Sequence, residues 1–304
     1  MKDLFRDVVG QVGKVILGKD DQIGLALTCL YARGHLLIED IPGIGKTTLA
    51  QGLARTLGLG FRRIQFTSDL LPGDVLGVSV FDQEASNFVF HPGPIFTQVL
   101  LADEINRATP KTQSALLEAM EERQVTIEGK TRPLVEPFFV IGTQNPIEQS
   151  GTFPLPDSQL DRFLIRIDLG YPGRDAERRL LETGETKGLL ADLPAVLSAE
   201  DVLGIQREVG RVTASTALLD YVLNLLEFTR TSPHFHVGLS PRAGLGILRA
   251  AQARAYIDGR AFVLPEDVQT VLPWVTGHRL KAARDFREIP RGELEEIFRK
   301  VPIP

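Results

Sequence analysis

The segment with the clearest chemical pattern is residues 42–48, which read Pro-Gly-Ile-Gly-Lys-Thr-Thr. It follows a short apolar run and opens a helical pattern. In that context a glycine-rich turn points backbone N–H groups and a helix N-terminus at one anionic group. The lysine can reach the β- and γ-phosphates of a nucleotide, and the hydroxyl after it can bind Mg²⁺. We therefore predict a phosphate loop formed by Gly43, Ile44, Gly45, Lys46, Thr47 and Thr48.

One position of this loop departs from the usual pattern. The full motif G-x-x-x-x-G-K-[ST] has a glycine where this chain has Asp40. The alternative interpretation is a glycine-rich turn with an incidental lysine. The apolar run before the loop and the helical pattern after it favour the phosphate site, because such a site needs both elements.

A second chemical pattern is Leu100-Leu101-Ala102-Asp103-Glu104, an apolar strand that ends in two carboxylates. In a nucleotide hydrolase Asp103 would hold Mg²⁺ through water, and Glu104 would polarise the attacking water. Taken alone, a strand that ends in Asp-Glu is common, and its carboxylates are often merely solvated. The place of this strand downstream of a phosphate loop favours the catalytic interpretation.

The residues around these motifs alternate between apolar runs and helical patterns. Helices are predicted over 47–57 and from Pro110 to about 122, where Thr109 and Pro110 suit the cap and first turn. Apolar strands separated by helices indicate an α/β fold with a parallel sheet covered on both faces. The runs that predict strands are 35–38, 61–66, 98–102, 138–142 and 163–167.

Two further segments predict β-hairpins inserted into this α/β pattern. The first pairs residues 78–81 with 88–90 across a polar turn, and the second pairs residues 125–127 with 131–134 across Glu-Gly-Lys. Each hairpin directly precedes a predicted strand. The alternative is that they are packing extensions of the main sheet.

Beyond Pro172 the strand patterns fade and helices dominate. We expect a nucleotide-binding domain over residues 1–187 and a smaller helical domain over 188–304, with a loop at 188–194 between them. The predicted helices are 174–181, 198–209, 215–229, 243–256, 265–272 and 291–298.

Composition limits the function classes. The 304 residues have a formal net charge of −5, which argues against a dominant nucleic-acid surface. The only cysteine is Cys29, so neither an intrachain disulfide nor a cysteine zinc site is expected. No apolar stretch is long enough to span a membrane, and the first residues do not read as a signal peptide, so we expect a cytoplasmic protein.

Several long motifs resemble the MoxR group of AAA+ ATPases, and the resemblance extends from about Gly18 to Arg260. It predicts a P-loop NTPase core followed by a small all-α lid domain. In that group the two hairpins correspond to inserts that face a central pore or a partner. The motifs that carry the resemblance are residues 103–122, 142–146, 151–156 and 159–163.

The resemblance implies roles for further residues. Asn145 matches the sensor-1 asparagine, which orients the attacking water together with Glu104. Arg162 matches the arginine that a neighbouring subunit supplies in trans, although a surface salt bridge is the alternative. Arg242 matches the sensor-2 arginine near a helix start, from which it could reach phosphate. The segment Val15-Ile16-Leu17-Gly18 lies where the group grips adenine through backbone and apolar contacts, so Gly18 is a predicted nucleotide-binding residue.

The resemblance thus implies ATP hydrolysis with Mg²⁺ in a ring, most simply a hexamer. Such a ring would act as a chaperone-like motor on a client protein, for example one with a von Willebrand factor A domain, and could serve metal or cofactor insertion. One alternative is a chelatase-type motor subunit or a DNA-translocating ring. Another is an ATP-gated assembly scaffold with little turnover.

Overall fold

Five parallel strands form the central sheet of the protein. We describe residues 1–84, 86–146, 151–184 and 187–303 of a computed structural model. The strand order is β2-β5-β8-β1-β9, so the strand before the phosphate loop lies between β8 and β9. All five predicted strands are confirmed, as β1 (Leu36–Glu39), β2 (Phe61–Gln65), β5 (Val99–Asp103), β8 (Phe139–Gln144) and β9 (Ile165–Ile167).

The two faces of this sheet pack against different helices. Alternate side chains of a strand point to opposite faces. Leu36 and Ile38 of β1 therefore join one core, while Leu37 joins the other. The first core includes α1 (Lys2–Gly13), α2 (Asp20–Tyr31) and α3 (Lys46–Thr56). The second core includes α4 (Pro72–Leu76), the 3-10 helix η1 (Ile105–Arg107) and α5 (Pro110–Glu122).

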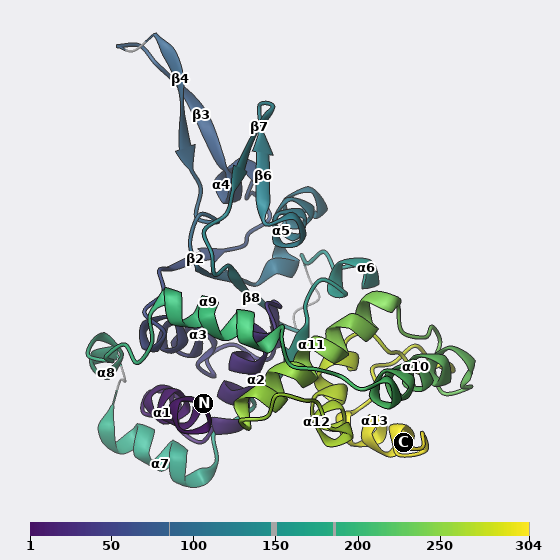
Figure 1. The fold of residues 1–304 in the computed structure, drawn as a ribbon. Helices are drawn as coiled ribbons and strands as arrows, with labels where there is room; N and C mark the ends of the chain where they lie inside the picture. The colour runs from purple at the N-terminus through teal and green to yellow at the C-terminus, as the bar shows by residue number, and fades with distance from the viewer. Residues whose placement is uncertain (85, 147–150, 185–186, 304) are drawn as a thin grey trace.

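Both predicted hairpins are present, and neither joins the central sheet. One pairs β3 (Gly77–Asp82) with β4 (Asn87–Pro92), and the other pairs β6 (Gln124–Ile127) with β7 (Lys130–Pro133). They project side by side from one end of the molecule, away from both termini (Figure 1). Arg132 stacks over the ring of Phe90 at 3.8 Å, which links the two hairpins near their bases.

The C-terminal part is helical, as predicted. It differs from the sequence prediction at residues 188–194, because most of this expected loop belongs to a short helix, α8. The assignment of residues 1–187 and 188–304 to separate domains stays a prediction. The remaining helices are α6 (Asp157–Leu160), α7 (Arg174–Thr183), α8 (Lys187–Ala191), α9 (Ala199–Val209), α10 (Thr216–Thr231), α11 (Pro241–Ile257), α12 (Pro265–Thr276) and α13 (Arg291–Phe298).

The helices that follow β9 contact the α/β core at several points. The side chain of Gln206 in α9 donates a hydrogen bond to the Leu30 carbonyl of α2 at 2.7 Å. Arg279, after α12, donates to the carbonyl oxygens of Asp161 and Phe163 just before β9. Among the described residues, no helix combines the length and hydrophobicity that a membrane crossing requires.

Candidate active site

The phosphate loop connects the carboxyl end of β1 to the first residue of α3. Gly43 and Gly45 both have positive φ, at 86° and 97°, a conformation that side chains rarely adopt. A Cβ built on Gly43 meets no atom within 4 Å, so the loop has open space on that side. The loop and the N-terminus of α3 therefore form a cradle suited to an anion.

Asp40 has a structural task that explains the missing glycine. Its carboxylate accepts hydrogen bonds from the backbone N–H of Ile41 at 2.8 Å, of Leu169 at 2.8 Å and of Gly170 at 2.6 Å. Glycine could make none of these bonds. Asp40 thereby ties the start of the phosphate loop to the segment that follows β9.

Lys46 is held in the loop by the backbone. Its Nζ donates to the Asp40 carbonyl at 2.6 Å, and the residue is 9% exposed. Burial lowers the pKa of Lys46, and the nearby charges of Asp103, Asp40 and Glu104 oppose that shift. The ammonium group therefore lies within the electrostatic influence of the two carboxylates at the carboxyl end of β5.

Asp103 is 8% exposed, and both of its carboxylate oxygens have partners. Oδ1 accepts from the Thr143 hydroxyl at 2.6 Å, and Oδ2 accepts from Nη2 of Arg63 at 2.6 Å. Each carboxylate oxygen has two lone-pair sites, so these bonds leave capacity for a water-linked cation. Asp103 and the half-buried Thr47 offer the oxygen atoms that Mg²⁺ prefers.

Glu104 has a left-handed backbone conformation, with φ of 55°, and its carboxylate is held on one oxygen. Oε2 accepts from the Gln65 amide at 2.8 Å and lies 2.8 Å from Nε of Arg107. The Glu104 N–H donates to the hydroxyl of Thr143 at 2.8 Å. The strained backbone and the two side-chain contacts hold the Glu104 carboxylate in place next to Asp103, the predicted magnesium ligand. A carboxylate held in this way suits the role of general base.

Sequence reasoning gave no role to Arg63, Gln65 or Thr143. Arg63 and Gln65 are two apart on β2, so they point to the same face, and Gln65 lies in register with Asp103. The sequence does contain one signal for these two residues, because polar side chains are unexpected at alternate positions of a strand in the core of the sheet. Thr143 is 0% exposed and bonds to both carboxylate residues, yet nothing in its local pattern distinguishes it from a core threonine.

The structure also places Asn145 and the segment before Gly18 near the loop. Asn145 follows the carboxyl end of β8, next to β1, and is 5% exposed. A Cβ on Gly45 would lie 2.9 Å from Cδ1 of Ile16, and one on Gly18 would lie 3.5 Å from Ala176. Residues 15–18 thus lie between the phosphate loop and α7, where a base could bind.

Arg162 and Arg242 do not lie at the phosphate loop of their own chain. Arg162 is 3.2 Å from Oε2 of Glu121, and Arg242 is 3.0 Å from Oε1 of the same carboxylate. Both arginines line a cavity of about 180 Å³ that also includes His35, just before β1. The phosphate loop follows the opposite end of β1, roughly 13 Å away along a four-residue strand. Arg162 forms an ion pair within its own chain, and Arg242 is not brought to its own phosphate loop; the role of Arg162 toward a neighbouring subunit stays a prediction.

Comparison with known proteins gives the family. A sequence model described as the ATPase family associated with various cellular activities (AAA) matches residues 35–165, and one of the AAA lid domain matches residues 227–300. The chain is 41% identical to Chaperone MoxR1 of Mycobacterium tuberculosis, over 97% of this chain and 81% of that protein. The chain belongs to the MoxR group of AAA+ ATPases. It is also 33% identical to Protein MoxR of Paracoccus denitrificans, over 99% of this chain and 96% of that protein.

A solved structure supports the fold of this chain. A crystal structure of a protein from Cytophaga hutchinsonii superposes with a TM-score of 0.91 and 38% sequence identity, and the match covers 100% of this chain and 96% of that one. The predicted AAA+ fold, with its parallel sheet, its lid and its two hairpins, is confirmed.

Proposed function

We propose that this MoxR-group protein hydrolyses ATP in a Mg²⁺-dependent reaction and uses the energy to remodel a partner protein. Water attacks the γ-phosphate, and the products are ADP and phosphate. The loop amides and Lys46 would bind the phosphates, while Thr47 and Asp103 would hold Mg²⁺, which would neutralise phosphate charge. Glu104 would accept a proton from the attacking water, and Asn145 would orient that water.

We propose that the active unit is a ring in which neighbouring copies complete each site. The observation that carries this proposal is the separation of Arg162 and Arg242 from their own phosphate loop. Because both lie beyond the opposite end of β1, they can stabilise phosphate charge only on the nucleotide of another copy. Glu121 would hold the two guanidinium groups together until a nucleotide replaces it. We take the ring to be a hexamer.

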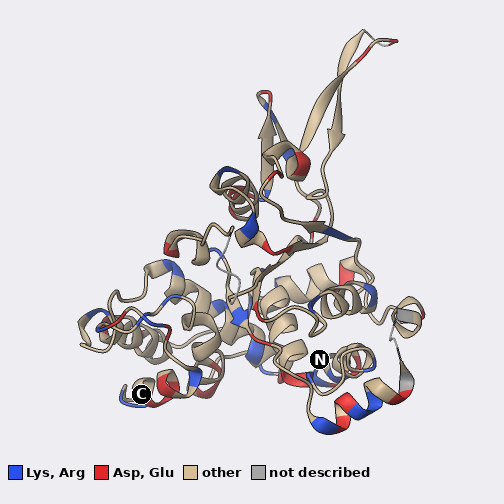
Figure 2. Ribbon diagram, turned by 180° about the vertical axis from the view of Figure 1, so that it is seen from behind, with Lys and Arg blue, Asp and Glu red and all other residues tan. Residues whose placement is uncertain are grey.

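The client would be a protein, and the hairpins are the elements best placed to contact it. Both project from the body, and the first hairpin carries few charges along its length (Figure 2). Exposed apolar side chains lie along the first hairpin: Val78, Val80, Phe81, Phe88 and Val89. The name of the relative Chaperone MoxR1 supports a remodelling role. A client with a von Willebrand factor A domain remains our expectation, and metal or cofactor insertion would be one outcome of such remodelling.

The test is the rate of ATP hydrolysis as a function of protein concentration. If each site needs a neighbour, specific activity should rise with concentration and then level off as rings form. Lys46→Ala should abolish both ATP binding and turnover, whereas Lys111→Ala, which changes an exposed lysine in the first turn of α5, should alter neither. A specific activity that is constant from monomeric to assembled protein would contradict the shared site. A chain that assembles with ATP but does not hydrolyse it would support the scaffold alternative.

A further inference from the structure

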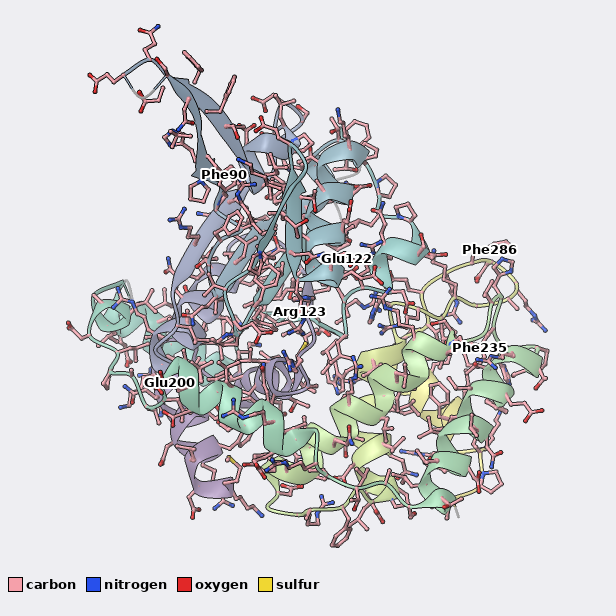
Figure 3. The ribbon with its side chains drawn as sticks, turned by 45° about the horizontal axis from the view of Figure 1, so that its top comes forward. Phe90, Glu122, Arg123, Glu200, Phe235 and Phe286 are labelled. Atoms are coloured by element: carbon pink, nitrogen blue, oxygen red, sulfur yellow. The ribbon has the colours of Figure 1, made fainter. Side chains whose placement is uncertain are left out.

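Three arginines form a basic surface next to the cavity that holds Arg162 and Arg242. We call Arg33, Arg123 and Arg249 the arginine surface. All three line that cavity and also a second, adjoining one of about 450 Å³. Arg123 follows the last residue of α5, where nitrogen-bearing side chains gather beside it (Figure 3). Arg249 is seven residues after Arg242, so both project from the same face of α11.

The backbone at two of these positions is unusual. Arg33 follows the C-cap of α2 with φ of 58°, and Arg123 is the C-cap of α5 with φ of 53°. Helices most often place glycine in this left-handed conformation, because a Cβ makes it unfavourable. Arg123 also donates to the Arg33 carbonyl at 2.8 Å, which holds the two turns together. Backbone strain of this kind is a feature of functional positions.

The positive charge of this surface is only partly balanced within the chain. Glu136 is 2.8 Å from Arg33 and 3.6 Å from Arg123, so two arginines share one carboxylate. Arg249 is exposed and has no ion pair among the residues that the structure describes. Burial, followed by the charge of Arg33, lowers the pKa of Arg123. An added anion would therefore be attracted here.

The chain carries a matching group of carboxylates beside the proposed adenine position. Asp20 and Asp21 are exposed in the first turn of α2, and Lys19, which donates to the Tyr171 carbonyl, lies between them and Gly18. Asp175 and Glu177 are exposed in the first turn of α7, on either side of Ala176, which a Cβ on Gly18 would touch. None of the four forms an ion pair within the described part of the chain. We call these four residues the acidic edge.

We propose that the arginine surface of one copy binds the acidic edge of the next copy in the ring. This inference rests on the proposed function, because it requires Arg162 of one copy to reach the nucleotide of the other, beside that copy's acidic edge. Two different, complementary surfaces make a head-to-tail contact, which closes into a ring when the rotation allows it. Arg33, Arg123 and Arg249 would thus select and orient the neighbour, whereas Arg162 and Arg242 would act on its nucleotide.

The experiment exchanges charges between the two surfaces and measures ring assembly in the presence of ATP. All variants carry Glu104→Gln, so that bound ATP should not be hydrolysed during the measurement. Arg249→Glu should raise the protein concentration for half-assembly by at least about tenfold, equivalent to about 1.4 kcal/mol. Reversing the acidic edge, as Asp20→Lys with Asp21→Lys or as Asp175→Lys with Glu177→Lys, should weaken assembly similarly. Arg249→Glu combined with one of these reversals should restore assembly to within about threefold. Arg299→Glu, which changes an exposed lid arginine outside the arginine surface, is the matched control.

The outcomes separate this inference from the proposed function. Recovery in a combined variant supports the pairing. Two outcomes overturn the inference but leave the proposed ring intact. In the first, Arg249→Glu assembles as well as the Arg299→Glu control. In the second, Arg249→Glu assembles poorly and neither reversal of the acidic edge restores its assembly. Failure of the parent protein to assemble with ATP at any concentration overturns the ring and this inference together. Thermal melting of each variant identifies any that fail to fold, and Arg249→Gln then replaces Arg249→Glu, with a smaller loss expected.

Discussion

Replacing Thr143 with valine should damage both stability and catalysis, because one hydroxyl organises both carboxylate residues. Thr143 is 0% exposed, and its Oγ1 donates to Asp103 at 2.6 Å and accepts from the Glu104 N–H at 2.8 Å. Valine has nearly the same shape but can form neither bond. It would leave a buried carboxylate oxygen and a backbone N–H without their partner.

The size of the stability effect follows from these two bonds. A hydrogen bond to a charged group contributes about 1.5–3 kcal/mol, and an unpaired buried polar group costs about 1–3 kcal/mol. Asp103 keeps its ion pair with Arg63, which limits the loss. We expect Thr143→Val to lower the free energy of unfolding by about 3 kcal/mol. We expect hydrolysis to fall by about 10²-fold, because both carboxylates lose their orientation.

Urea unfolding and steady-state hydrolysis measure the two effects. Thr143→Ser keeps the hydroxyl and should retain most activity. Thr276→Val is the matched control, because Thr276 is equally buried and its hydroxyl donates to the Leu272 carbonyl of its own helix. That carbonyl keeps its helical bond, so the control should lose less than about 1 kcal/mol. If Thr143→Val and Thr276→Val lost equal stability and kept equal activity, the role given to Thr143 would be wrong.

Four other predictions can be checked on the same protein. Lys46→Ala should abolish ATP binding in calorimetry, because it removes the charge that faces the phosphates; an affinity within about threefold of wild type would contradict the site. Glu104→Gln should bind ATP normally but lose about 10²-fold in single-turnover rate, the size of a general-base contribution. Asp40→Ala should lower the free energy of unfolding by about 2–3 kcal/mol, because three backbone N–H groups lose their acceptor; an unchanged urea midpoint would refute this. Burial lowers the pKa of His35 from 6.5 to about 4, so the unfolded chain binds the proton first. His35 should therefore lower stability by up to about 1.4 kcal/mol per pH unit as the pH drops from 6.5 toward 4, and His35→Gln should remove this part of the slope while that of the buried His278 remains.

The fold could be predicted from sequence largely because its strands and caps have strong local signals. The runs that became β1 and β5 are continuous and apolar, and Thr109-Pro110 marks the start of α5. The glycine and proline of segment 188–194 suggest a linker, yet residues 188–191 belong to α8, which contacts α3, and only residues 192–194 lie outside a helix. Tertiary contacts thus overrode a weak local preference.

The site was predictable where chemistry depends on contiguous residues. Lys46, Asp103 and Glu104 lie in local motifs, and the structure brings their charges together. The Arg63 contact with Asp103 depends instead on the alignment of two strands that are distant in sequence. The pairing of Arg162 with Arg242 through one carboxylate depends on how the lid packs, and that packing has no local signal.

Mixing two inactive variants tests the central claim of a shared active site most directly. Arg162→Ala should leave its own phosphate loop and Glu104 intact, while Glu104→Gln should leave Arg162 intact. In a mixed ring, some interfaces then combine Glu104 of one copy with Arg162 of its neighbour. Steady-state hydrolysis of such mixtures should exceed the sum of the two separate preparations once subunit exchange has been verified. Mixtures that exchange subunits and yet show no recovery at any ratio would contradict the account.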